Sequence, residues 1–205
     1  MSIVKLNNNG VKNATAFGSI TGLGSMVFIK KLTASSSSTL SFVDGASSVV
    51  LDNTYKEYLF TFKDIHPATN DTDFEFNGST DAGSNYNVTK TTTNFRAYHN
   101  EAGNSSALNY NTGGDLAQST NFQRLMRITN GNDESGVGYL HIFNPSSTTF
   151  VKHFISNCNN INSNTYSLQE IVAGYFNTTS AIDAIQFKFA SGNIDAGDIC
   201  LYGIA

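Results

Sequence analysis

The chain has no tryptophan, only two cysteines and few charged residues, and each shortage removes a class of protein. Cys158 and Cys200 lie far apart in sequence and form no Cys-x-x-Cys pair. This excludes a disulfide-dense secreted scaffold, and we expect two free thiols. Charged residues make up 14 % of the 205 positions, well below the ordinary quarter, and the formal net charge is −4.

Long basic and long apolar runs are also missing. No basic run exceeds the pair Lys30-Lys31, whereas nucleic-acid binding needs a concentrated positive surface. No apolar run approaches the ~20 residues that cross a bilayer. The opening Met1–Lys5 is followed by three asparagines and so lacks the apolar core of a signal peptide. We therefore expect no nucleic-acid partner, no membrane insertion and synthesis in a cytoplasm.

Neutral polar residues and aromatics dominate instead. The chain holds 25 Asn, 23 Ser and 21 Thr, which are residues of turns and strand surfaces, and its core formers include 15 Phe and 9 Tyr. The depletion of helix-forming Lys, Glu and Ala argues against helices. This composition and length predict a single all-β domain, a jelly-roll-like antiparallel β-sandwich.

The chain divides into an arm and a body. Residues 1–24 contain a glycine-spaced stretch of small residues with too little periodicity for a core element. This segment is either a loose leader or an arm that docks the body to a neighbouring subunit. In the second case its apolar contacts are expected to be Val11, Phe17, Ile20 and Leu23. Residues 25–205 form the body.

Period-two alternation predicts a succession of short strands in the body. The last 24 residues are the clearest: Ile185, Phe187 and Phe189 alternate with Gln186 and Lys188, a turn is expected at 191–193 and another at 196–198, and the run 199–204 ends the chain. A strand is also favoured over a capped helix at 166–176, and 103–119 is expected to be a long loop. The remaining expected strands are 26–32, 39–43, 58–62, 74–76, 86–88, 95–97, 122–128, 138–143 and 150–155.

Four segments carry a resemblance to a known family. They are Phe187–Ile204, Ser38–Gly45, Tyr55–Asp71 and Leu140–Ser147. In their order along the chain they resemble a large group of bacteriophage virion surface proteins (marine phage-like), the β-sandwich modules of tail fibres, baseplates and head decorations. The resemblance covers roughly residues 30–205.

The resemblance implies a structural, non-enzymatic protein of the virion surface, assembled in the host cytoplasm. It implies a homo-oligomer, with a trimer favoured by analogy, other virion proteins as partners, and contact with a host receptor or surface glycan. Tail and head placements both stay open. The family offers no catalytic motif, so no functional residue is transferred and no cofactor is expected.

Two alternative functions remain, a carbohydrate-binding, lectin-like module and a glycan hydrolase. Sugar sites combine aromatic faces with amide hydrogen bonds, and four tyrosines lie among Asn-rich segments. The lack of tryptophan removes the commonest stacking residue, and no carboxylate pair stands out for hydrolysis. Carboxylates at Asp71, Asp73 and Asp81, and the run Asn132-Asp133-Glu134, offer calcium ligands but lack the spacing of an EF-hand loop. The expected glycan or receptor contacts are Tyr86, Tyr98, Tyr110 and Tyr166.

Overall fold

The computed structural model describes residues 26–162 and 165–204. Within these ranges the chain forms twelve β-strands and no helix. The all-β prediction is therefore confirmed. The strands are β1 (Met26–Thr33), β2 (Leu40–Val43), β3 (Glu57–Pro67), β4 (Thr72–Ser79), β5 (Lys90–Asn100), β6 (Ser106–Tyr110), β7 (Gln123–Ile128), β8 (Gly136–Phe143), β9 (Lys152–Ile161), β10 (Tyr166–Phe176), β11 (Ala184–Phe189) and β12 (Ile194–Ile204).

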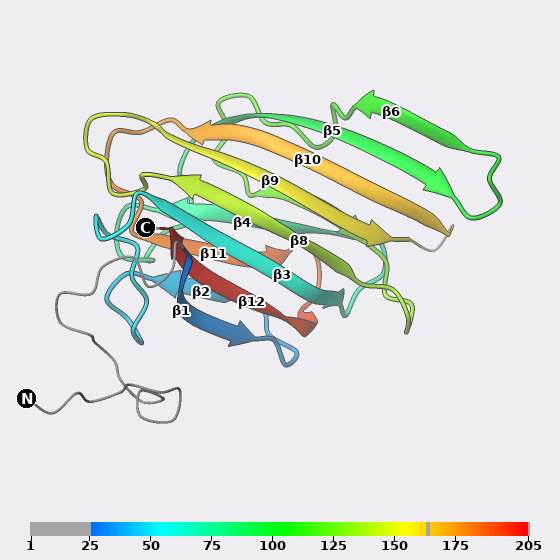
Figure 1. The fold of residues 1–205 in the computed structure, drawn as a ribbon, viewed down its shortest axis with the longest axis horizontal. Helices are drawn as coiled ribbons and strands as arrows, with labels where there is room; N and C mark the ends of the chain where they lie inside the picture. Colours follow the sequence, from blue (N-terminus) through cyan, green and yellow to red (C-terminus); the bar gives the residue numbers. More distant parts are fainter. Residues whose placement is uncertain (1–25, 163–164, 205) are drawn as a thin grey trace, which may run out of the picture.

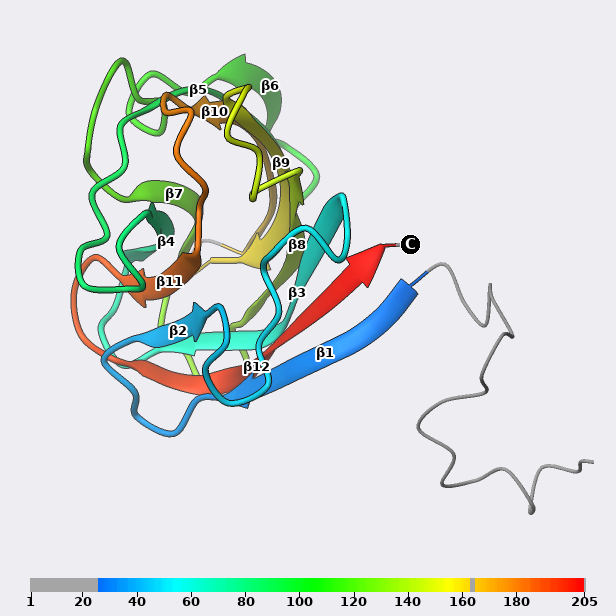
Figure 2. The ribbon, with the colours of Figure 1, turned by 90° about the vertical axis from the view of Figure 1, so that its left-hand side faces the viewer.

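The strands build two antiparallel sheets packed face to face as a sandwich (Figure 1). The larger has the order β1-β12-β3-β8-β9-β10-β5-β6, and the smaller has the order β2-β11-β4-β7. Figure 2 shows the eight-stranded sheet curving around the four-stranded one. The jelly-roll connectivity is not confirmed, because these strands divide eight and four whereas a jelly roll joins two Greek keys of eight strands in total.

Phenylalanines from both sheets fill the space between them. Phe60 and Phe62 of β3 meet Phe187 of β11, each with a ring-centroid separation of 5.3 Å. Phe187 also stacks on Phe74 of β4 at 5.9 Å. All four rings are 3 % exposed or less. Edge-to-face and offset aromatic pairs contribute beyond the burial of their area, so this cluster is the main contact that joins the sheets.

The expected strand at 166–176 is confirmed as β10, but two other predictions were wrong. Residues 86–88 lie in the connection between β4 and β5 and form no strand, since the side chain of Asn77 donates a hydrogen bond to the carbonyl of Tyr86 where a strand partner would bond. The expected loop at 103–119 contains β6, which pairs with β5 from Phe95–Tyr110 to His99–Ser106. The sequence around β6 is rich in Ser and Asn and is typical of a loop. It forms a strand because its backbone pairs with β5.

The C-terminal segment forms β11 and β12, as its alternation predicts. The turn expected at 196–198 is instead a bulge inside β12, where the pairing with β3 shifts register. Gly197 adopts φ +122° there, and a Cβ at this position would lie 2.8 Å from the carbonyl oxygen of Asp64. Glycine is therefore required for a bulge, where the sequence pattern alone indicates a turn.

Both cysteines are free, as expected. Cys158 is buried on the inner side of β9, and burial raises the pKa of its thiol to about 12. Cys200 lies on β12 between the inward-facing Ile199 and Leu201, so its side chain points to the opposite side of the sheet. A disulfide between them is excluded by this geometry.

Two lysines are fully buried at the ends of β5 and β9, the strands on either side of β10. Lys90 and Lys152 are the register partners of Phe176 on either side of β10. The Nζ of Lys90 donates to Asn77 Oδ1 at 2.6 Å and to the Val88 carbonyl at 2.9 Å, while Lys152 donates to the carbonyls of Thr178 and Ser180. Both tie a loop to the sheet. Burial lowers the pKa of Lys90 to about 7.

This pKa predicts that the stability of the protein depends on Lys90 above neutral pH. Below pH 7 both folded and unfolded chains carry the charged ammonium, and the full cost of burying it is present. Between pH 7 and the ordinary value of 10.5 the unfolded chain binds more protons, so stability rises with pH. We expect the free energy of unfolding of the wild type, minus that of Lys90→Met, to increase by about 1–2 kcal/mol from pH 7 to pH 8.5.

Urea unfolding of both proteins at each pH measures this difference. Taking the difference between wild type and variant cancels the contributions of other groups, including the opposing effect of the Cys158 thiol near pH 9. A difference that stays constant over this range would contradict the prediction.

Candidate binding site

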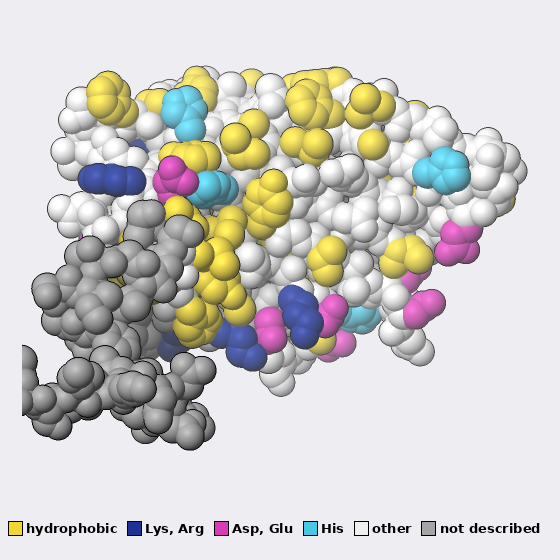
Figure 3. Space-filling view, in the orientation of Figure 1, with side chains coloured by type: hydrophobic (Ala, Val, Ile, Leu, Met, Phe, Trp, Pro, Cys, Tyr) yellow, Lys and Arg dark blue, Asp and Glu magenta, His cyan; other side chains and the backbone are white. Residues whose placement is uncertain are grey.

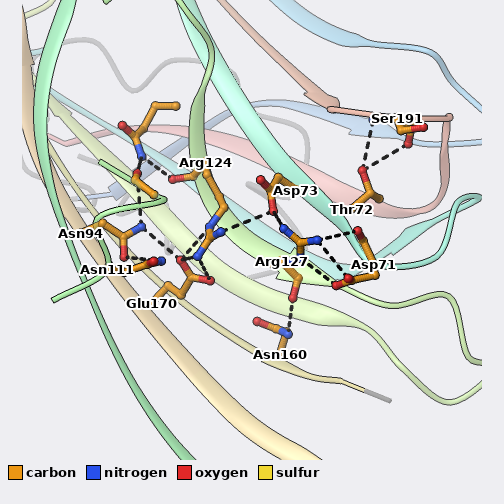
Figure 4. Close-up of polar contacts among 12 residues, drawn as sticks. Asp71, Thr72, Asp73, Asn94, Asn111, Arg124, Arg127, Asn160, Glu170 and Ser191 are labelled. Atoms are coloured by element: carbon orange, nitrogen blue, oxygen red, sulfur yellow. Dashed lines mark hydrogen bonds and ion pairs between the residues drawn. The ribbon is translucent and has the colours of Figure 1, made fainter. Parts of the chain in front are cut away.

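A network of ion pairs crosses the sandwich near the free edge of the four-stranded sheet (Figure 4). Arg124 of β7 donates to Glu170 of β10 through Nε and Nη2, at distances of 3.0–3.1 Å. Asn94 of β5 donates to the same carboxylate at 3.1 Å. The side chains of Glu170 and Arg124 are 1 % and 10 % exposed. Every oxygen of Glu170 is therefore occupied, and the pair connects the two sheets.

The network continues along β4 toward the surface. Asp73 lies 3.6 Å from both Arg124 and Arg127, and Arg127 donates to the carboxylate of Asp71 at 2.7 and 2.9 Å. The guanidinium of Arg127 lowers the pKa of Asp71 through these hydrogen bonds. Two of the three aspartates considered as calcium ligands, Asp71 and Asp73, are thus paired with arginine, and the third, Asp81, accepts from Ser79 and Asn85.

No three metal-binding side chains converge within the described residues. Likewise, no helix in this part of the chain is long and apolar enough to cross a membrane.

Beyond β7 the eight-stranded sheet extends past the four-stranded one, and a pocket of about 220 Å³ opens there. Figure 1 shows the ends of β5, β6 and β10 projecting at this side of the molecule. Tyr98 of β5 is the register partner of Leu168 of β10, and its ring meets that of Tyr166 edge to face at 5.4 Å. We call this site the tyrosine pocket; its lining is Arg96, Tyr98, Asn162, Tyr166 and Leu168.

Arg96 provides the only charge in the tyrosine pocket. Its guanidinium lies over the ring of Tyr98, 5.9 Å from the centroid. Its register partner on β10 is Glu170, whose oxygens already accept from Arg124 and Asn94. Among the described residues Arg96 is the one arginine with no ion pair, and its Nε is buried without a hydrogen-bond partner. The pocket therefore presents an uncompensated positive charge beside two aromatic rings.

The structure brings together two of the four tyrosines expected to bind glycan. Tyr98 and Tyr166 share the tyrosine pocket. Tyr110 lies on β6 and points to the other side of the sheet with Phe95, and its hydroxyl donates to Asp115 at 2.7 Å. Tyr86 precedes β5, whose first residue is separated from Tyr98 by ~26 Å of extended strand. Strand direction and side-chain alternation therefore separate Tyr86 and Tyr110 from the tyrosine pocket.

Arg96 and Leu168 were missed by the sequence analysis. Arg96 and Tyr98 alternate in step with the buried Thr92 and Asn94, and this signal places them on one side of β5. The expected arm contacts Val11, Phe17, Ile20 and Leu23 lie outside the described residues.

The outer side of the eight-stranded sheet carries a second feature, an apolar face over β8, β9, β10, β5 and β6. One row across it runs through register partners Tyr139, Asn157, Ile171, Phe95 and Tyr110. Several of its large side chains are well exposed: Val137 43 %, Tyr139 39 %, Ile155 45 %, Phe95 41 %, Leu108 79 % and Tyr110 47 %. Figure 3 shows this surface as yellow and white with histidines in cyan among them, and with most acidic and basic groups toward its margins.

His99, His141 and His153 face outward on these five strands, whereas their Lys, Arg and Glu residues all have inward-facing positions. They are Lys90, Arg96, Lys152 and Glu170, three of which are no more than 1 % exposed. The usual arrangement of a sandwich, with apolar residues inside and charges outside, is therefore reversed over this part of the sheet. Large exposed apolar patches of this kind mark interaction surfaces.

Comparison of the chain with protein-family models, with curated proteins and with solved structures finds no match in any of the three.

Proposed function

We propose that the protein is a non-enzymatic structural component of the bacteriophage virion surface, and that it assembles as a homo-oligomer through the apolar face. The observation that carries the proposal is this face, a sheet surface without Lys, Arg, Asp or Glu on which large apolar residues are exposed on a single chain. The resemblance of residues 30–205 to virion surface modules supports the same role. A trimer, and contact with other virion proteins, follow from that resemblance.

A second copy of this chain fits the apolar face best. Five strands spaced ~4.8 Å apart and ~30 Å long present ~700 Å², close to the ~800 Å² that each partner contributes to a standard interface. Because the face carries no Lys, Arg, Asp or Glu side chain, two copies meet without like-charge repulsion at a pH where its histidines are neutral. A shallow hollow of about 480 Å³ lined by Ile155, Ala173 and Tyr175 gives the face relief for side chains of a neighbour.

Light scattering of the purified full-length protein tests self-assembly. We expect a mass of three times the 22.1 kDa chain, and we expect Ile155→Glu to reduce it to that of one chain. Phe150→Glu is the matched control, since Phe150 is 71 % exposed but lies in the β8–β9 connection, outside the five strands of the face. Removal of residues 1–24 should leave the number of chains in the assembly unchanged, because the face belongs to the body.

A wild-type protein that is monomeric at tens of micromolar would refute assembly through this face. The virion assignment has its own test. Mass spectrometry of purified particles from a phage that encodes the chain should detect its peptides in a copy number divisible by three. Absence of these peptides from the particles would refute the virion assignment.

A further inference from the structure

We propose that the tyrosine pocket binds a single carboxylate-bearing sugar residue, with Arg96 recognising the carboxylate and Tyr98 and Tyr166 packing against the sugar ring. This goes beyond the structural role proposed above and is independent of self-assembly, because the pocket opens on the opposite side of the sheet from the apolar face.

The charge of the site selects the ligand class. Arg96 has no carboxylate partner within the described residues, and the only acidic residue beside it in register, Glu170, is saturated by Arg124 and Asn94. A guanidinium binds a planar carboxylate through two parallel hydrogen bonds. No Asp or Glu lines the pocket, so nothing in it repels an anion. An anionic group is therefore favoured over a neutral or cationic one.

The rings select a sugar over a smaller anion. The Tyr98 and Tyr166 rings are inclined at 84°, so they form two walls of a corner above Leu168. Apolar ring faces pack against the C–H groups of a sugar, and neither tyrosine hydroxyl has a hydrogen-bond partner among the described residues, which leaves both for sugar hydroxyls. The guanidinium of Arg96 lies over the ring of Tyr98, so the positive charge and one of the two aromatic walls are adjacent.

The size of the pocket limits the ligand to one ring. About 220 Å³ is below the range of pockets that enclose drug-sized ligands. The pocket is open to solvent along the projecting end of the sheet, so the rest of a polysaccharide chain can continue outward. With no carboxylate in its lining, the pocket lacks the acid and base pair of a glycosidase and is a binding site.

Titration of the full-length protein with two probes tests the proposal, by calorimetry and by saturation-transfer NMR. Methyl β-D-glucuronide carries the carboxylate, and methyl β-D-glucoside is its neutral counterpart. We expect millimolar binding of the glucuronide, at least tenfold tighter than that of the glucoside, with saturation transfer strongest at the ring C–H protons. Acetate at the same concentration should not displace the glucuronide.

Three variants assign the contacts. Arg96→Met should reduce glucuronide affinity to that of the glucoside, and Tyr166→Ala should weaken glucuronide at least tenfold. Lys63→Met removes an equal charge from a side chain that is 73 % exposed on β3, so it should change nothing. Thermal unfolding and light scattering of each variant should match the wild type, which separates loss of the site from loss of fold or assembly.

The proposal is overturned if neither glycoside binds at tens of millimolar, if both bind the wild type equally, or if Arg96→Met binds glucuronide as the wild type does. None of these results bears on self-assembly, which is read from the mass alone.

Discussion

Replacing Glu170 with alanine is expected to lower the free energy of unfolding by about 3–5 kcal/mol, because it leaves the Arg124 guanidinium buried without its partner. The side chain of Arg124 is only 10 % exposed, and its remaining ion-pair partner, Asp73, lies 3.6 Å away and is shared with Arg127. Asn94 loses an acceptor as well. Urea unfolding monitored by circular dichroism measures the loss.

Two comparisons make this expectation specific. Asp71→Ala breaks the Arg127–Asp71 pair, whose side chains are 46 % and 57 % exposed, and should cost less than about 1 kcal/mol. The double variant Arg124→Met, Glu170→Leu removes both buried charges and should recover most of the loss, since a buried pair barely offsets its own desolvation. A Glu170→Ala loss no larger than that of Asp71→Ala would show that the pair does not connect the sheets.

Replacing Phe187 with alanine is expected to cost about 3–5 kcal/mol. Phe187 is fully buried on β11 and packs against Phe60 and Phe62 of the larger sheet, and against Phe74, Phe76 and Phe42 of the smaller one. The surrounding rings come from three different strands and cannot collapse together into the vacated space. Most of the cost is therefore the remaining cavity.

Chemical unfolding of three variants tests this position. Phe187→Leu retains part of the volume and should lose less than Phe187→Ala. Phe150→Ala removes the same side chain from a position that is 71 % exposed and should change stability by less than about 0.5 kcal/mol. Equal losses for Phe187→Ala and Phe150→Ala would mean that the aromatic cluster contributes little to the cohesion of the sheets.

Alternation predicted most strands because each long strand has one face against the phenylalanine core. The pattern Phe60, Phe62, then Phe74, Phe76 and Phe187, Phe189 is visible in sequence and is buried in the structure. The errors have a different physical origin. β6 has little apolar alternation and is regular only through its pairing with β5, and Gly197 serves a bulge that the position of Asp64 requires.

The candidate sites depended on information that alternation does not contain. Tyr98 and Tyr166 are 68 positions apart and meet only because β5 and β10 are neighbours in the register Leu168–Tyr98. Tyr110 of β6 is the register partner of Phe95, so its side chain lies on the opposite face of the sheet from Tyr98 and Tyr166. The resemblance to virion proteins carried no residue roles, so it indicated neither site.

By itself the sequence determined the all-β class, the strands with apolar alternation and the weakness of charge on the surface, because composition and period-two spacing are local properties. Only the tertiary structure decided which side of each strand faces the second sheet. Lys90, Lys152 and Glu170 are buried although they are charged, because they lie on the sides of their strands that face the second sheet. The apolar face and the tyrosine pocket both result from that choice, since the larger sheet has an uncovered outer side and an end that extends past its partner.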